Sequence, residues 1–120
     1  MTKYIFFNSR DELLRIEIGK VVCFEADGNY TNIILANKLK CTVPLNLTQT
    51  AKVLEDSLKK EAMQFVRLGK KCIVNIEYVY RINVLKQTLV LSDFSDFIYQ
   101  VNMSREAAKK LKEVIVQLKR

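Results

Sequence analysis

Short strand-like runs separated by turn signals fill most of this chain, and they constrain its fold more than any other feature. Apolar, aromatic and β-branched residues recur in runs at 4–7, 13–18, 21–24, 30–35, 39–43, 64–68, 72–74, 84–91 and 97–103. Runs that alternate or are continuously apolar over such lengths predict strands. Residues 75–80 fit either a single helical turn or another extended piece. The sequence therefore predicts a mainly β fold.

Three of these runs predict an antiparallel meander. Val21–Phe24 indicates a central strand, Tyr30–Leu35 returns beside it, and residues 39–43 alternate strictly. The Asp-Gly pair at 27–28 is a strong hairpin signal, because glycine accepts the positive φ that a tight turn requires. Pro44 ends the meander, since proline has no N–H to donate to a ladder.

Two stretches have helical periodicity. Leu47–Lys59 predicts one internal helix, with Asn46 as its N-cap and Gln49 completing a capping box. Arg105–Leu118 predicts a C-terminal helix with Ser104 as its N-cap. The apolar stripe expected on this second helix consists of Ala107, Ala108, Leu111, Val114, Ile115 and Leu118. With these helices the predicted fold class is mainly β within the α+β class.

Size and composition limit the class of protein further. A length of 120 residues suits a single domain over 1–120, of which 1–15 could be an N-terminal extension. Lys and Arg number 20 against 13 Asp and Glu, and this net charge of +7 favours a negatively charged partner. Cys23, Cys41 and Cys72 lie in apolar runs, so we expect buried, reduced thiols. No apolar run approaches the ~20 residues of a membrane span, so we expect a cytoplasmic protein with no membrane partner.

Enzyme activity and metal binding are disfavoured. The sequence contains no histidine, which excludes Ser-His-Asp and Cys-His arrangements and zinc sites built on histidine. The cysteines form no Cys-x-x-Cys pair, and the glycines form neither a GxGxxG motif nor a P-loop. We therefore expect no catalytic residues, no metal and no cofactor.

Cations on loops remain as candidate functional groups. Gly69, Lys70 and Lys71 stand between two strand-like runs, which predicts an exposed, positively charged loop tip. Arg67 lies just before this tip and is either a contact or a structural partner. Asn75, after the second run, we expect to be structural and to cap the following turn.

Further polar and charged groups lie on other predicted turns. They are Asn29 in the hairpin turn, Lys38 and Lys40 around the next turn, and Arg105 at the start of the last helix. A cation in the first turn of a helix opposes the helix dipole, which hints at another use for Arg105. Loops at one end of a β scaffold can meet phosphates at several points and bring amide or guanidinium groups to base edges.

Taken together, the spaced motifs resemble a LytTR-type DNA-binding domain, the output module of many bacterial response regulators. The resemblance runs from about residue 16 to 118 and rests on Val-Cys-Phe-Glu-Ala-Asp-Gly-Asn-Tyr at 22–30, the Leu-rich helix after Pro44, Phe-x-Arg at 65–67, Ile-Val-Asn at 73–75, and Met-Ser-Arg at 103–105. It implies an elongated β fold of short antiparallel strands whose loops contact successive grooves of double-stranded DNA. It also implies a transcriptional regulator at repeated sites, with a homodimer on DNA as one arrangement.

By position, the resemblance places Asn29 or Tyr30 in a first contact loop, Lys70 in a central one and Arg105 in a third. Arg67 and Lys71 complete the candidate DNA-binding set. The central loop departs from the family, because Gly-Lys-Lys at 69–71 replaces the usual His-Arg-Ser. Lysine lacks the bidentate fork of arginine, so we expect this loop to contribute more phosphate affinity and less base discrimination.

Two other functions stay open at this point. An RNA-binding β module would stack bases on exposed aromatic rings, for which Tyr30, Tyr78, Tyr80 and Tyr99 are candidates. A protein-interaction or dimerisation domain would use an exposed edge of the sheet.

Overall fold

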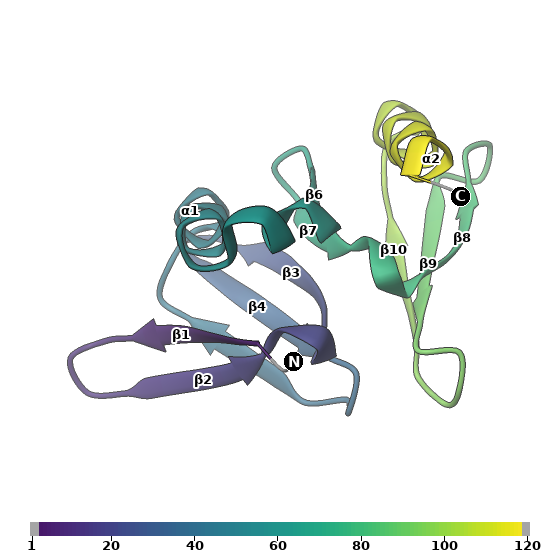
Figure 1. Cartoon of the computed structure of the whole chain (residues 1–120). Helices are drawn as coiled ribbons and strands as arrows, with labels where there is room; N and C mark the ends of the chain where they lie inside the picture. Colours follow the sequence, from purple (N-terminus) through teal and green to yellow (C-terminus); the bar gives the residue numbers. More distant parts are fainter. Residues whose placement is uncertain (1–2, 119–120) are drawn as a thin grey trace.

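The computed structural model describes residues 3–118, which form three antiparallel sheets and two α-helices (Figure 1). The helices are α1 (Leu47–Leu58) and α2 (Arg105–Leu118). The strands are β1 (Tyr4–Asn8), β2 (Leu13–Glu17), β3 (Val21–Asp27), β4 (Tyr30–Leu35), β5 (Lys40–Val43), β6 (Phe65–Leu68), β7 (Cys72–Asn75), β8 (Val79–Asn83), β9 (Thr88–Ser92) and β10 (Ile98–Asn102). The described chain extends 44 × 34 × 28 Å. The predicted fold class is confirmed.

The elements stack in three layers around a five-stranded sheet of order β5-β4-β3-β7-β6. The β3-β4-β5 meander predicted from the sequence is therefore confirmed, with β3 in the centre. Figure 1 shows the β1–β2 hairpin and α1 on one side of this sheet, and the β8–β10 sheet and α2 on the other. Each interface has its own buried cluster, one around Phe24 and Leu54 and the other around Val74, Leu89 and Leu111.

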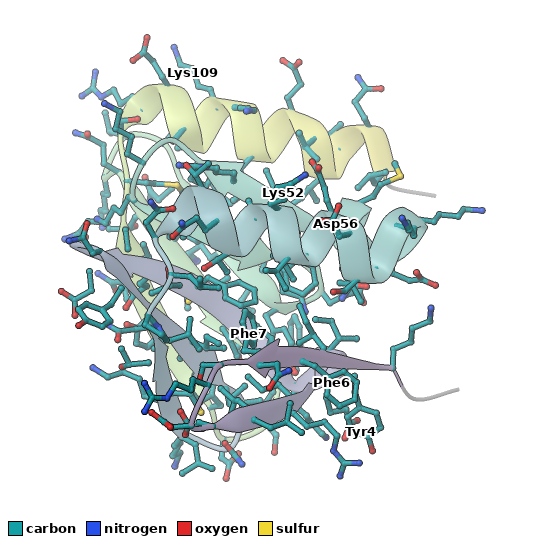
Figure 2. The ribbon with its side chains drawn as sticks, turned by 90° about the vertical axis from the view of Figure 1, so that its left-hand side faces the viewer. Tyr4, Phe6, Phe7, Lys52, Asp56 and Lys109 are labelled. Carbon is teal, nitrogen blue, oxygen red and sulfur yellow. The ribbon has the colours of Figure 1, made fainter. Side chains whose placement is uncertain are left out.

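The β1–β2 hairpin shows how alternation fixes the outer layers. Ile5 and Phe7 are buried against the central sheet, whereas Tyr4 and Phe6 point outward and are exposed (Figure 2). The Tyr4 ring is partly covered by charge, because the Arg15 guanidinium lies 4.5 Å from its centroid. A period of two residues in sequence thus becomes a core face and a solvent face.

The helix starts agree with the sequence. Asn46 accepts from the Gln49 backbone N–H at 2.8 Å and donates its own N–H to the Gln49 side chain at 2.9 Å, which completes the predicted capping box. The Ser104 hydroxyl accepts from Ala107 N–H at 3.1 Å and caps α2. The apolar stripe predicted for α2 is confirmed except at its last residue, Leu118. Its middle is buried, but Leu118 at its end is 48% exposed.

The stretch between β7 and β9 corrects the predicted strand boundaries. Residues 76–78 form the single helical turn that was one of two alternatives, and Asn75 caps it by accepting from Glu77 N–H at 3.0 Å, as expected. The single strand predicted over 84–91 is wrong. A strand ends at Asn83 and another begins at Thr88, with a turn between them. Alternation did not reveal this turn because it contains neither glycine nor proline.

All three cysteines are free, but only Cys23 and Cys72 are buried. Cys41 is partly exposed on β5, so the expectation of burial is wrong for this residue. Within residues 3–118, no helix is long and apolar enough to cross a membrane.

Candidate nucleic-acid interface

The first predicted contact loop is the tip of the β3–β4 hairpin. Asp27 pairs with Tyr30, so the turn itself consists of Gly28 and Asn29, and Gly28 has a φ of +63°. Glycine adopts this left-handed conformation at little cost, so the chain can form the two-residue turn. Asn29 is exposed and Tyr30 is 52% exposed. The amide and the phenol therefore both face solvent at one end of the central sheet.

The β6–β7 loop lies directly beside this hairpin. The backbone N–H of Ala26, one residue before the end of β3, donates to the Lys71 carbonyl at 2.9 Å. Gly69 takes a φ of +62°, and Lys71 N–H donates to the Leu68 carbonyl at 3.3 Å, which closes the loop. Lys70 at the tip is exposed. The predicted exposure of this basic loop is confirmed.

Arg67 fixes the β6–β7 loop through two side-chain hydrogen bonds. Its Nε donates to the Gly69 carbonyl at 2.8 Å, and a terminal guanidinium nitrogen donates to the Thr48 hydroxyl at 3.0 Å. Thr48 lies in the first turn of α1. The side chain thus connects the basic loop to the N-terminal end of the internal helix.

Lys71 connects the same loop to the third predicted contact segment. Its ammonium group donates to the carbonyl of Asn102, the last residue of β10. Two residues separate Asn102 from Arg105, which is exposed and opens α2. A hollow of about 260 Å³ lies between the loop and the helix start. Its lining includes Lys70, Lys71, Ser104 and Ala107.

The six predicted residues therefore gather at one end of the molecule. Backbone and side-chain hydrogen bonds link the β3–β4 tip to the β6–β7 loop, and that loop to the β10–α2 junction. In Figure 2, α1 and α2 run the same way across the picture, with Lys52 before Asp56 on α1 and Lys109 toward the same end of α2, so the two helices begin on the same side. We call this surface the contact end. It comprises Asn29, Tyr30, Arg67, Lys70, Lys71 and Arg105.

Lys38 and Lys40 do not belong to the contact end, contrary to expectation. The β4–β5 connection follows Leu35, at the opposite end of β4 from the Tyr30 tip. It is fixed there by Ala36 N–H, which donates to the Lys20 carbonyl at 2.9 Å. The antiparallel register that brings Tyr30 to one end necessarily carries Lys38 to the other.

Sequence reasoning missed two other segments at the contact end. One is the first turn of α1, where Thr48 accepts from Arg67. The other is the turn at 84–87 between β8 and β9, in which Lys86 is exposed and Gln87 accepts at its carbonyl from Met103 N–H at 3.0 Å. Asn83 was the available signal for this turn, because asparagine initiates turns by bonding to a backbone N–H further along.

The four tyrosines considered for base stacking do not share a surface. Tyr78 is buried, and its hydroxyl donates to the Gly19 carbonyl at 2.6 Å. Tyr99 is half-buried and donates to Glu25 at 2.8 Å. Tyr80 is exposed but stacks edge to face with Phe94, away from the Tyr30 hairpin tip. In the described part of the chain, no three His, Cys, Asp or Glu side chains are grouped so that they could hold a metal ion.

Comparisons with known proteins concern the family and the fold of the chain. A family model described as the LytTr DNA-binding domain matches residues 11–116. Among solved structures, the chain is similar to the LytTr DNA-binding domain of a Bacillus cereus protein described as a methyl-accepting/DNA response regulator. The two are 21% identical, the match covers 93% of this chain and 95% of that one, and the TM-score is 0.64. At this identity the likeness is one of fold. No curated protein sequence matches the chain.

Proposed function

The chain belongs to the LytTR family of DNA-binding domains, whose model covers residues 11–116, and from this premise we propose that it binds specific duplex DNA sites through the contact end. In this role it acts as a bacterial transcriptional regulator on repeated sites, two copies to a pair of sites. The family assignment carries DNA binding and transcription regulation in general. The sequence specificity, the contact residues and the repeated sites are our proposal.

The observation that carries the proposal is the hydrogen-bonded link between three loops from distant parts of the sequence. Ala26 N–H bonds to the carbonyl of Lys71, and the ammonium group of Lys71 bonds to the carbonyl of Asn102. The loops are therefore held in fixed relative positions before any ligand arrives. Preorganised groups lose less conformational entropy on binding, which favours a single register on the duplex.

Each contact group has a distinct chemical role in this proposal. Arg105 is exposed at the start of α2, and its guanidinium can form two parallel hydrogen bonds with the O6 and N7 acceptors of guanine. Lys70 carries a compact charge suited to phosphate. Asn29 offers an amide donor and acceptor to a base edge, and Tyr30 lies beside it. Lys71 and Arg67 contribute charge while their bonded donors hold the loop in place.

The Gly-Lys-Lys sequence of the β6–β7 loop indicates how affinity and specificity are divided. Neither lysine has the rigid planar fork with which arginine reads guanine, and Lys71 is already engaged with Asn102. The central loop thus supplies charge, and discrimination depends on the two outer segments at Asn29 and Arg105. The β6–β7 loop is therefore suited to bind the phosphates of a polyanion without a strong preference for particular bases.

A binding-site selection from random duplexes, followed by titrations at stepped salt, tests the proposed function. We expect a preferred duplex, weaker binding of RNA, and a log–log salt slope of about −0.9 for each phosphate neutralised. Arg105→Ala should weaken specific binding and relax discrimination at one base pair by about 1–3 kcal/mol. Little information is expected at the base pairs under the β6–β7 loop.

Several results would contradict the proposal. Equal affinity for duplex and RNA would favour an RNA-binding module. Duplex binding whose affinity does not change with salt would favour a protein-interaction domain. Equal loss on all sequences for the Arg105→Ala variant would make Arg105 a phosphate contact. Lys38→Gln at the opposite end is the matched control and should leave binding almost unchanged.

A further inference from the structure

A fourth segment, the turn at residues 84–87 between β8 and β9, also lies at the contact end. It is not one of the three segments to which DNA contacts were assigned above. Asn83 pairs with Thr88 across its base, and Thr88 pairs in turn with Asn102 of β10. Asn102 is the residue whose carbonyl accepts from Lys71. Through this register the turn lies next to the β10–α2 junction.

The turn is held firmly in this place. Met103 N–H donates to the Gln87 carbonyl at 3.0 Å, which joins the turn to the segment that leads into α2. Asn83 accepts at its side chain from Lys86 N–H at 2.9 Å, and Gln87 N–H donates to the Val84 carbonyl at 3.3 Å. Gln87 adopts a φ of +55°, a conformation that non-glycine residues take only when neighbouring bonds favour it.

The tip of this turn presents a cation together with apolar surface. Lys86 is exposed, and within residues 3–118 its ammonium group makes no ion pair or hydrogen bond. Leu85 beside it is 74% exposed, the largest exposed fraction among the large hydrophobic side chains of the described chain. A free ammonium next to an aliphatic group suits a phosphate and its sugar, since the phosphate accepts the charge and the sugar offers carbon surface.

We propose that this turn is a fourth DNA-contacting element, in which Lys86 binds a backbone phosphate outside the segment reached by Arg105. The proposal rests on the function proposed above and extends it. The row of contacts then runs from the β3–β4 tip through the β6–β7 loop and the β10–α2 junction to the β8–β9 turn. Duplex DNA carries about one negative charge per 1.7 Å of its axis, so a longer row meets more phosphates.

A lysine–phosphate contact has a definite energetic signature. It adds affinity equally on all sequences, because phosphates are the same at every base pair. It also releases counterions, so its loss reduces the salt slope by about one unit. Lys86 thus supports affinity, while Arg105 supports discrimination.

The test compares Lys86→Gln with Lys38→Gln on the selected duplex and on single-base variants of it, from 50 to 200 mM salt. Both substitutions remove one exposed positive charge from a turn, but Lys38 lies at the opposite end of the molecule. The Lys86 backbone N–H that bonds to Asn83 is retained, so the turn should persist, and thermal unfolding of both variants checks this. We expect Lys86→Gln to weaken binding about 3- to 10-fold at low salt on every duplex and to lower the salt slope by about one. Lys38→Gln should change the affinity less than about twofold, because a distant exposed charge is screened.

Two outcomes would overturn this inference. If Lys86→Gln behaves like Lys38→Gln while Arg105→Ala weakens binding, the β8–β9 turn is not a contact, although the three-loop proposal survives. If the Lys86→Gln effect is concentrated at one base pair, the side chain reads a base instead of a phosphate. Failure of the proposed function has a different signature, since Arg105→Ala and Lys70→Gln would then also leave duplex binding unchanged.

Discussion

Arg67 combines a structural and an electrostatic role in one side chain. It donates to the Gly69 carbonyl and to the Thr48 hydroxyl, and these bonds fix the position of the β6–β7 loop. A guanidinium has five N–H donors, so two internal bonds leave others directed to solvent. The positive charge therefore remains part of the contact end while the loop is held in place.

Asn75 makes one hydrogen bond to a neighbour in sequence and another to a distant strand. Its capping bond to Glu77 N–H follows from sequence, because asparagine readily accepts from a backbone N–H two residues on. Its second bond, from the side-chain amide to the Val21 carbonyl at 2.8 Å, joins β7 to the start of β3. No local pattern indicates that partner, since it lies 54 residues away and is set by strand pairing.

Cys72 lies directly under the β6–β7 loop and reports on whether the loop opens. Burial raises the pKa of the Cys72 thiol to about 11, the Glu25 carboxylate adds to the rise, and Lys71 opposes it. Burial also raises the pKa of Cys23, again with a contribution from Glu25. The thiolate is the reactive form, so alkylation of the native protein at pH 8 should modify Cys41 first and leave Cys23 and Cys72 protected.

Mass spectrometry after a timed alkylation counts the modified thiols. Denaturant should make all three cysteines react, which is the control for reagent access. Rapid modification of Cys72 in the native protein would contradict the account, because it would mean that the loop separates from the strands beneath it.

At the scale of elements, the C-terminal end of α1 carries avoidable strain. Lys59 closes the helix with φ +52° and ψ −110°, a region that side chains with a Cβ rarely occupy. Glycine has no Cβ, so Lys59→Gly should raise the free energy of unfolding by about 1 kcal/mol even after its larger unfolded-state entropy is counted. Lys60→Gly, which removes the same charge where φ is not positive, should instead lower stability by about 0.5–1 kcal/mol.

Urea unfolding followed by circular dichroism measures both changes. The prediction is wrong if Lys59→Gly destabilises the protein as much as Lys60→Gly does. That result would mean that the Lys59 side chain makes a stabilising contact that outweighs the backbone strain.

The apolar stripe of α2 extends beyond the core against which the helix packs. The helix has 14 residues and is about 21 Å long, and the residues that pack against the core lie between Ala107 and Ile115. Ala108 and Leu111 lie over the core, but the helix continues beyond it, and Leu118 remains 48% exposed. Periodicity shows which face of a helix is apolar, and the extent of the core beneath the helix decides how much of that face is buried.

Sequence patterns predicted most elements, because strand alternation, capping boxes and Asp-Gly turns act over a few residues. The β3–β4–β5 meander, α1 and the start of α2 all follow from such local rules. The turn at 84–87 did not, since its Asn83 signal is embedded in an alternating run. The contact residues could be named from turns and from the family resemblance, but only the register shows that Lys38 lies away from them.

For the whole molecule, the three-layer arrangement explains why the contact loops lie together. The tips of β3–β4 and β6–β7 belong to the central sheet, and the β10–α2 junction belongs to an outer layer. Lys71 connects these two layers by its bond to Asn102. The contact end therefore draws its groups from two layers, which suits a partner that is itself long and regular.

The most direct test of this account is a map of backbone amide chemical shifts on addition of the selected duplex. We predict the largest changes at residues 28–31, 69–71, 84–87 and 102–107, with few changes around Lys38 and residues 93–97 at the opposite end. Changes centred on the opposite end, or spread equally over both ends, would contradict the claim that one face of the protein binds DNA.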